Sequence, residues 1–200
     1  MHIQGVLPNC DGNIGPMKFP KHWATMRTQI ASVSSAEAES LTALFNSSSD
    51  IAALDPTFRT VDIREVLRHI EESERAETVE RGFRMQAIRL SGSRELVGYF
   101  HFREGTPKPD VVALTMFFIR PEFRSQGYGR EVAQSLIEKL SEDLMNRAAW
   151  GRVYLKNIPA LRFWFSLGFT HVVKHKREHV QIEGDHANII LERPLQRTTR

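Results

Sequence analysis

Hydrophobic and polar positions follow different patterns in different parts of the chain, and each pattern predicts a different element. Residues 111–119 form the longest nearly apolar run, interrupted only by Thr115, which is typical of a central strand buried on both faces. Residues 83–90 and 95–103 have mixed β character and flank a Ser-Gly-Ser segment, which predicts a hairpin. Further strands are expected, from rough alternation or short apolar runs, at residues 23–33, 153–155, 170–182 and 188–191.

Four segments instead repeat apolar residues at helical spacing. Ser34 followed by Glu37, and Asp62 followed by Glu65, have the spacing of a capping box and mark the starts of the first two helices. The last helix is bracketed by a proline at its start and a glycine after its end. The expected buried stripes are Ala38, Leu41, Leu44 and Phe45; Ile63, Val66, Leu67 and Ile70, in a helix running to about residue 77; Val132, Ala133, Leu136, Ile137 and Leu140; and Ala160, Phe163, Trp164 and Leu167.

The order of these elements, β-α-α-β-β-β-α-β-α-β-β, predicts one mixed α/β domain over residues 23–195. Residues 1–22 contain three glycines and three prolines without periodicity, so they are read either as an irregular arm or as a disordered tail. Residues 196–200 are expected to be a short C-terminal tail. A chain of 200 residues is long enough to bury a substantial core.

Composition and charge argue against several classes of protein. With 41% hydrophobic and 26% charged residues, the chain is neither disordered, collagen-like nor a coiled coil as a whole. The net charge of +3 is too small to indicate nucleic-acid binding, although it suits an anionic small ligand. No apolar stretch approaches the about 20 residues of a membrane span, and no secretory signal is visible. Cys10 is the single cysteine, so no intrachain disulfide is expected and a cytoplasmic location fits.

The segment most informative about chemistry is the loop between the run 111–119 and the third helix. The first N–H groups of a helix have no partner within the helix, and the helix dipole adds positive charge there, which favours an anion. Gly127 and Gly129 allow close approach of the backbone, and Arg124 and Arg130 add charge. A P-loop and a dinucleotide fingerprint are both disfavoured, because neither glycine pattern is complete here.

Two motifs make the sequence resemble the GNAT superfamily of acyl-CoA-dependent N-acyltransferases. The family's loop pattern, Gln/Arg-x-x-Gly-x-Gly/Ala, is matched by residues 124–129 after the lead Pro-Glu-Phe at 121–123. The second pattern begins 28 residues after Gly129, in the order that the family requires. The resemblance extends over roughly residues 25–195, with its specific part at 111–169. The second pattern is matched by Asn157, Ala160, Phe163, Gly168 and Phe169.

This resemblance implies a fold and a cosubstrate. The expected fold is a mixed, mostly antiparallel sheet of six to seven strands, with a V-shaped splay between central strands and four flanking helices. Acetyl-CoA would bind with its pyrophosphate on the loop and its pantetheine arm along the strand that ends at residue 119, and no metal is expected. The residues that the resemblance assigns to this cosubstrate are Phe118, Ile119, Arg124, Ser125, Gln126, Gly127, Tyr128, Gly129, Arg130, Asn157, Phe163 and Trp164.

The acid and base of the reaction are less well defined by the resemblance. The tyrosine that usually protonates the leaving thiolate falls at Trp164, whose N–H is no useful acid, so Tyr128 and Tyr154 are candidates alongside a packing role. Where the family sometimes has a carboxylate, this chain has Ala113 or Thr115. His101 is therefore the candidate catalytic base, the alternative being a partly exposed strand histidine.

The sequence thus predicts an N-acetyltransferase that transfers an acetyl group from acetyl-CoA to a primary amine of a small molecule, a peptide or a protein N-terminus. The alternative is a non-catalytic GNAT-fold module that binds acyl-CoA, which the loss of the tyrosine favours. A weaker alternative is an unrelated phosphate-binding α/β domain. No nucleic-acid or membrane partner is expected, and a homodimer is compatible with the sequence.

Overall fold

The structure is a computed structural model that describes residues 19–47, 49–55, 58–76, 82–178 and 186–195. Most of the predicted N-terminal arm, with Cys10, lies outside these residues, as do the C-terminal tail, the expected end of the second helix at residue 77 and the segment 179–185. The strands are β1 (His22–Ala24), β2 (Thr28–Ser32), β3 (Phe83–Leu90), β4 (Leu96–Glu104), β5 (Val111–Ile119), β6 (Ala148–Tyr154), β7 (His171–Glu178) and β8 (His186–Pro194). The α-helices are α1 (Ala38–Asn46), α2 (Ser49–Ala52), α3 (Ile63–Ala76), α4 (Tyr128–Glu142) and α5 (Ile158–Ser166).

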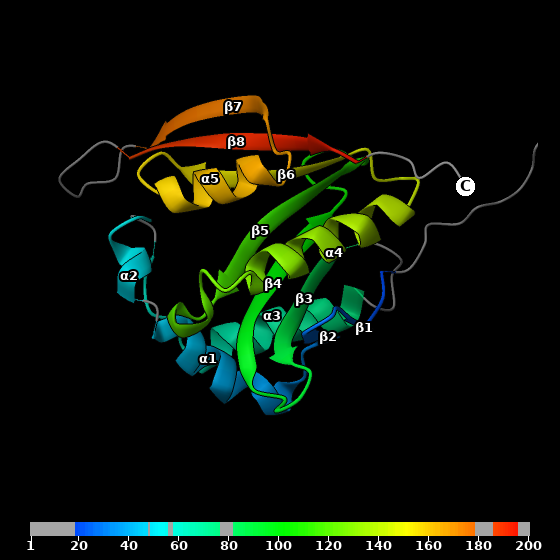
Figure 1. The fold of residues 1–200 in the computed structure, drawn as a ribbon, viewed down its shortest axis with the longest axis vertical. Coiled ribbons are helices and arrows are strands. Elements are labelled where there is room, and N and C mark those ends of the chain that lie inside the picture. Colours follow the sequence, from blue (N-terminus) through cyan, green and yellow to red (C-terminus); the bar gives the residue numbers. More distant parts are fainter. Residues whose placement is uncertain (1–18, 48, 56–57, 77–81, 179–185, 196–200) are drawn as a thin grey trace, which may run out of the picture.

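All eight strands belong to one mixed sheet, in the order β1-β2-β3-β4-β5-β6-β8-β7 (Figure 1). Neighbouring strands are antiparallel except for the central pair β5 and β6, which are parallel. The crossover between β5 and β6 is made by α4, as parallel neighbours require. This confirms the predicted α/β architecture, with one or two strands more than expected.

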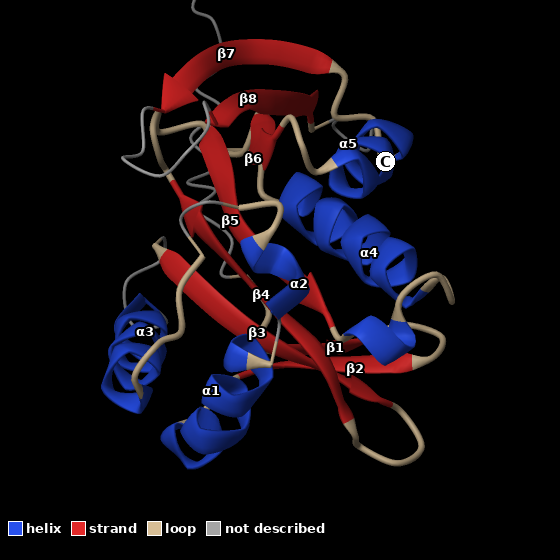
Figure 2. Ribbon diagram, turned by 90° about the vertical axis from the view of Figure 1, so that its left-hand side faces the viewer, coloured by secondary structure: helices blue, strands red, loops and turns tan. Residues whose placement is uncertain are grey.

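Helices cover both faces of the sheet (Figure 2). The helices α4 and α5 lie on one face, where Phe100, Phe102 and Leu136 are almost completely buried. The helices α1 and α3 lie on the other face, where Leu41 and Ile70 pack against strand residues. Burial of each large apolar side chain stabilises the fold by about 1.5–3 kcal/mol. The helical stripes read from the sequence thus explain which helix faces meet the sheet.

The parallel pair β5–β6 is hydrogen-bonded over only part of its length. The ladder joins Val111–Leu114 to Ala148–Gly151 and ends there, although both strands continue. The register between β4 and β5 shifts beyond His101, so that Thr115 is an extra residue, a β-bulge. We call the space between the diverging ends, residues 115–119 and 152–154, the β5–β6 gap. It is the splay that the resemblance implied.

Three elements differ from the expectations. The single strand predicted at residues 23–33 is a hairpin, in which β1 and β2 are joined by a tight turn closed by a 2.8 Å bond from the Thr25 N–H to the Thr28 carbonyl. That turn contains neither glycine nor proline, so the sequence shows no break. Strand β6 starts at Ala148, five residues earlier than expected, and the short helix α2 was missed.

Candidate active site

The glycine loop, residues 124–130, connects the end of β5 to α4 through a short turn at Pro121–Phe123. Ser125 and Gly127 both have positive φ angles, of 60° and 86°. Gly127 is the residue before α4, and its left-handed conformation is favourable for glycine. The N–H groups of Tyr128, Gly129 and Arg130 form the first turn of the helix, where no acceptor exists within the helix. The loop therefore has the geometry of the predicted anion site.

The β1–β2 turn, about a hundred residues away in sequence, also contacts this loop. Arg27 donates from Nε to Oε2 of Glu131 at 2.7 Å and from Nη1 to the Gln126 carbonyl at 3.0 Å. Its guanidinium lies 4.3 Å from the ring centroid of Tyr128. Burial would raise the pKa of Glu131, but hydrogen bonds from Thr25 and Arg27 outweigh it and hold that pKa below its usual range. The pairing shields the anion site from the Glu131 carboxylate.

An aromatic cluster of β5 and α5 packs against the end of the loop, where α4 begins. Phe163 and Trp164 of α5 lie 5.8 and 5.6 Å from Phe117 of β5, measured between ring centroids. A Cβ atom added to Gly129 would lie 3.4–3.7 Å from Ile119, Phe117 and Phe163, which is ordinary van der Waals contact. The start of α4 therefore packs closely on β5 and α5.

Two polar contacts fix α5 beside the β5–β6 gap. Asn157 precedes α5, and its side-chain oxygen accepts a hydrogen bond from the Ala160 N–H at 3.0 Å. Arg130 donates to the Ser166 hydroxyl at 2.7 Å, which joins the first turn of α4 to the end of α5. Asn157 thus lies at the gap and also caps the helix.

Alternation along β5 decides which backbone groups face the gap. The N–H of Arg120 donates to the Val97 carbonyl at 2.9 Å, so it points toward β4. Because backbone groups of successive strand residues point to opposite sides, those of Phe118 also face β4, and those of Phe117 and Ile119 face the gap. Arg124 Nε donates to the Ile119 carbonyl at 2.8 Å. Phe117 is therefore a gap-facing residue that the sequence reasoning missed.

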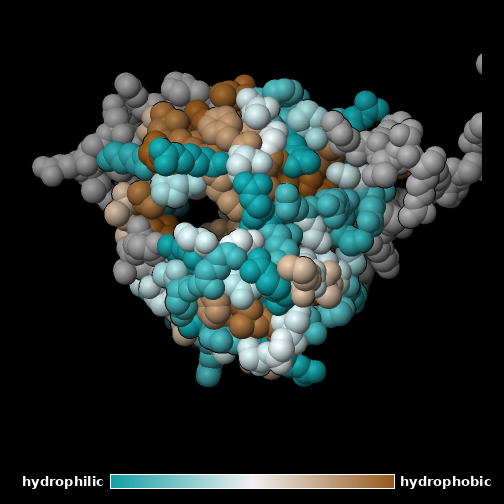
Figure 3. Space-filling view, in the orientation of Figure 1, coloured by the Kyte–Doolittle hydropathy of each residue, from teal (hydrophilic) through white to brown (hydrophobic). Residues whose placement is uncertain are grey.

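A cavity of about 480 Å³ occupies the β5–β6 gap and crosses the sheet. Figure 3 shows the surface hollowed here, between α5 and the segment carrying α1 and α2. Ala149 and Val153 of β6 belong to the core under α4 and α5, so Trp150, Arg152 and Tyr154 point to the opposite face. The cavity is lined by Phe45, Ile51, Asp55 and Phe58 on the α1–α2 side, by 113–117 of β5, by 150–154 of β6, by Asn157, Ala160 and Trp164 near α5, and by Pro107 and Ile190.

The candidate base His101 lies beside this cavity, next to a residue that lines it. Its Nδ1 is 2.6 Å from the hydroxyl of Thr115, which in turn lies 3.2 Å from the His101 carbonyl. The hydroxyl can donate to that carbonyl when Nδ1 carries the proton, or to Nδ1 in the other ring tautomer. Burial lowers the pKa of His101 to about 3, and the positive charges of His69 and Arg103 add to this effect. His101 is thus neutral at pH 7 and reaches the cavity through Thr115.

Of the two candidate tyrosines, Tyr154 lines the cavity and Tyr128 lies under the Arg27 guanidinium. Within the described residues, no three His, Cys, Asp or Glu side chains are placed to hold a metal ion. In the same part of the chain, no helix combines the length and the apolarity needed to cross a membrane.

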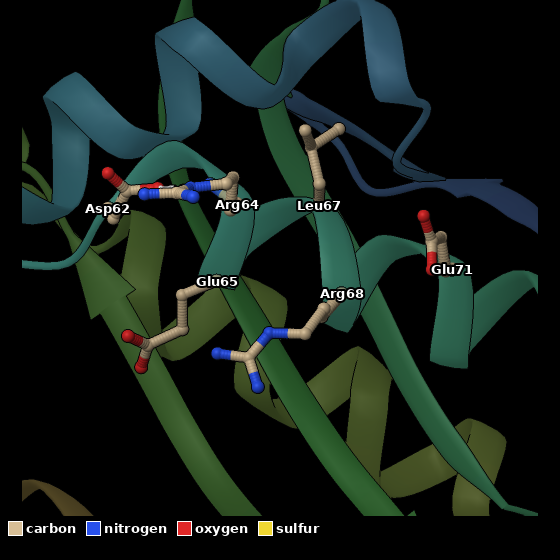
Figure 4. Close-up of a pocket in the computed structure, with 6 residues that line it drawn as sticks. All are labelled: Asp62, Arg64, Glu65, Leu67, Arg68 and Glu71. Carbon is tan, nitrogen blue, oxygen red and sulfur yellow. Dashed lines mark hydrogen bonds and ion pairs between the residues drawn. The ribbon is translucent and has the colours of Figure 1, made fainter.

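A separate hollow lies on the outer side of α3 (Figure 4). Its side chains carry charges of both signs, and Asp62 binds the Arg64 N–H at 2.8 Å as part of the helix start. None of the sequence-predicted site residues lies there, so we interpret it as a charged helix face. The lining residues are Asp62, Arg64, Glu65, Leu67, Arg68 and Glu71.

Comparisons with known proteins agree with this geometry. The sequence model of the Acetyltransferase (GNAT) family matches residues 52–169. No curated protein matches the sequence closely enough to count as a relative. An acetyltransferase from Thermus thermophilus has a similar structure, with 22% identity, a TM-score of 0.63, and coverage of 86% of this chain and 100% of that chain.

Two similar structures contain bound ligands. One is yncA from Salmonella typhimurium, solved with its cofactor acetyl-CoA, with 18% identity, a TM-score of 0.67, and coverage of 86% of this chain and 96% of that chain. The other is spermidine N-acetyltransferase from Vibrio cholerae in complex with CoA and spermine, with 15% identity, a TM-score of 0.67, and coverage of 84% and 95%. At these identities the structural likeness shows the fold alone.

The family match carries more weight, because it spans more than half of the 200 residues. The matched residues include both sequence motifs, and with them the glycine loop and the strand ends on either side of the β5–β6 gap. The resemblance inferred from residues 124–129 and 157–169 is thereby confirmed. The chain belongs to the GNAT acetyltransferase family.

Proposed function

We propose that this chain transfers an acetyl group from acetyl-CoA to a primary amine. The observation that carries the proposal is the β5–β6 gap, which lies beside the glycine loop and contains a cavity that crosses the sheet. Two reactants can therefore enter from opposite faces and meet between the strands. The ligands bound to the two similar structures support acetyl-CoA as the cosubstrate.

Acetyl-CoA would lie on the α4–α5 face. The N–H groups of residues 125–130 would hold the pyrophosphate at the start of α4, where the helix dipole favours negative charge. The pantetheine arm would follow the gap-facing backbone of Phe117 and Ile119, with Asn157 and the Phe163–Trp164 pair on its other side. The thioester would then lie near Phe117, within the cavity.

The reaction balances with the amine and the thioester alone. The acceptor ammonium first loses a proton, because only the neutral amine has a lone pair for attack. The nitrogen forms a bond to the acetyl carbon, and gap-facing N–H groups of β5 stabilise the negative oxygen of the intermediate. The C–S bond then breaks, its electron pair leaves with the CoA sulfur, and the sulfur takes the proton that the attacking nitrogen loses. One proton is released to solvent for each acetyl group transferred.

A catalytic role for His101 is a separate proposal. The amine would pass its proton to the Thr115 hydroxyl while that hydroxyl gives its own proton to His101 Nδ1, 2.6 Å away; this relay requires the ring tautomer in which Nδ1 is unprotonated. The pKa of about 3 opposes protonation of this ring, so the imidazole would hold the proton only in passing. Replacement by glutamine should change the acid limb of the pH–rate profile, whereas an identical profile would assign deprotonation to another group or to solvent.

The proposed function is tested by CoA thiol release from acetyl-CoA in the presence of different amines. Amine-dependent release, with the N-acetylated product identified by mass spectrometry, is expected. The alternative is a module that binds acetyl-CoA without turnover, and Trp164 in place of the usual tyrosine favours it. Tight binding of acetyl-CoA in calorimetry, without release for any amine, would support that alternative.

A further inference from the structure

The wall of the cavity on the α1–α3 face has a distinctive pairing of charges. Among the described residues that line the cavity, Asp55 and Arg152 are the charged ones. Asp55 follows α2 on one side of the gap, and Arg152 belongs to β6 on the other. The two side chains therefore present opposite charges from opposite walls of the space where an acceptor would lie.

The remaining surface of this half of the cavity is apolar and largely aromatic. Phe45 and Phe58 stack with their ring centroids 5.3 Å apart. Trp150 lies across the gap, and its Nε1 donates to Glu192 at 2.6 Å, which fixes the indole. Tyr154 lies on the same face of β6, with Arg152 between it and Trp150, and the guanidinium of Arg152 is 5.8 Å from the Tyr154 ring centroid. Such walls favour an apolar or aromatic body.

We propose that the acceptor is an amino acid with an aromatic or large aliphatic side chain, acetylated on its α-amino group. This inference rests on the proposed acetyl transfer and adds the substrate class. The ammonium would approach Asp55 and the nearby aromatic faces, both of which attract a cation. The α-carboxylate would bind the guanidinium of Arg152, whose planar donors match a carboxylate. The side chain would pack between Phe58 and Trp150.

Charge also argues against a polyamine acceptor. A polyamine carries several ammonium groups and would need several carboxylates along its path. Here the described lining offers one carboxylate and one guanidinium. The guanidinium of Arg152 would repel the second ammonium of a polyamine, whereas it attracts the carboxylate of an amino acid.

The test compares three acceptors by the kcat/KM of CoA thiol release: phenylalanine, phenylalaninamide and spermidine. Phenylalaninamide has the same ring and amine but lacks the carboxylate. We expect phenylalanine to be used at least about tenfold better than the amide and than spermidine, which corresponds to about 1.4 kcal/mol. R152Q should reduce the preference for phenylalanine over the amide to within about twofold. D55N should lower kcat/KM for both at least about tenfold.

Two matched variants control for the loss of a charge as such. Arg162→Gln removes a guanidinium from the exposed side of α5, and Glu39→Gln removes a carboxylate from the exposed side of α1. Both lie outside the cavity lining, so neither should change the preference. Equal use of phenylalanine and its amide by the wild-type protein would overturn the proposal, and so would a preference that survives in R152Q.

The outcomes also separate this inference from the proposed function. If spermidine or the amide is the best acceptor, acetyl transfer stands and the amino-acid inference fails. If no amine releases CoA, the proposed function fails, and calorimetry of phenylalanine with the CoA-loaded protein then decides the binding site. Phenylalanine binding that is lost in R152Q would support the amino-acid site even without turnover. If phenylalanine does not bind to the wild-type protein, the amino-acid inference is overturned as well.

Discussion

Replacement of Gly127 by aspartate or asparagine isolates the charge of the proposed pyrophosphate site. Both new side chains have nearly the same size, and both tolerate a left-handed backbone better than most residues, so both variants bear a similar conformational cost of about 1–2 kcal/mol or less. In both, the new Cβ atom would lie 3.1 Å from Nη2 of Arg27, the tip of a flexible side chain that can shift by a few tenths of an ångström. The variants therefore differ mainly in one negative charge.

That charge would lie beside a bound pyrophosphate. Two unit charges 4 Å apart interact by about 1 kcal/mol in water and about 4 kcal/mol at the effective dielectric of a protein surface. Arg27 would compensate part of the repulsion, although it already pairs with Glu131. We therefore expect Gly127→Asp to bind acetyl-CoA at least about tenfold more weakly than Gly127→Asn, or about 1.4 kcal/mol.

Titration calorimetry at low and high salt measures this difference, and thermal unfolding of both variants is the control. The two variants should unfold at similar temperatures, and the ratio of their dissociation constants should shrink as salt screens the repulsion. Equal affinities of the aspartate and asparagine variants would refute the reasoning, because no phosphate could then lie at the start of α4.

Three further predictions concern the fold and the site. The pKa of His101 is about 3 in the folded protein and about 6.5 in the unfolded chain. Between these two pH values the unfolded chain binds more protons than the folded protein. The free energy of unfolding should therefore fall as pH decreases from 6.5 to 3, by at most about 1.4 kcal/mol per pH unit. Denaturant unfolding of His101→Gln should lack that part of the slope, and an unchanged slope would contradict it. Trp164→Phe should lose less than about tenfold in kcat, since it keeps an aromatic wall, and a hundredfold loss at unchanged Tm would show that the indole N–H acts in the chemistry. Gly98→Ala should lower Tm by several degrees, because its Cβ would overlap the Phe118 carbonyl, while Gly92→Ala, with open space around it, should not.

Local patterns in the sequence were sufficient for the elements that build the cosubstrate side of the site. The apolar run of β5, the glycines at 127 and 129, and the stripe of α5 each depend on neighbours a few residues away. Their structures accordingly agree with the prediction. The V-shaped splay came from the family resemblance, since no local pattern encodes the end of a ladder between two strands.

Contacts between distant segments could not be predicted in the same way. Arg27 and Glu131 meet only because the β1–β2 turn folds against the first turn of α4. Asp55 and Arg152 share a cavity only because α2 lies opposite the end of β6. Neither pair has a spacing in the sequence that reveals it, and each side chain by itself is typical of a solvated surface.

The short ladder between β5 and β6 also has a mechanical consequence. Four residue pairs, Val111–Leu114 with Ala148–Gly151, are the described strand-to-strand link between a five-stranded half and a three-stranded half. Beyond this ladder the two halves are joined by the apolar core under α4 and α5, so a molecule bound in the β5–β6 gap would contact both halves. Amide hydrogen exchange in β5 and in β6 should then slow together when a ligand binds, even one that is never turned over. This concerted protection offers a way to find ligands of the protein without a catalytic assay.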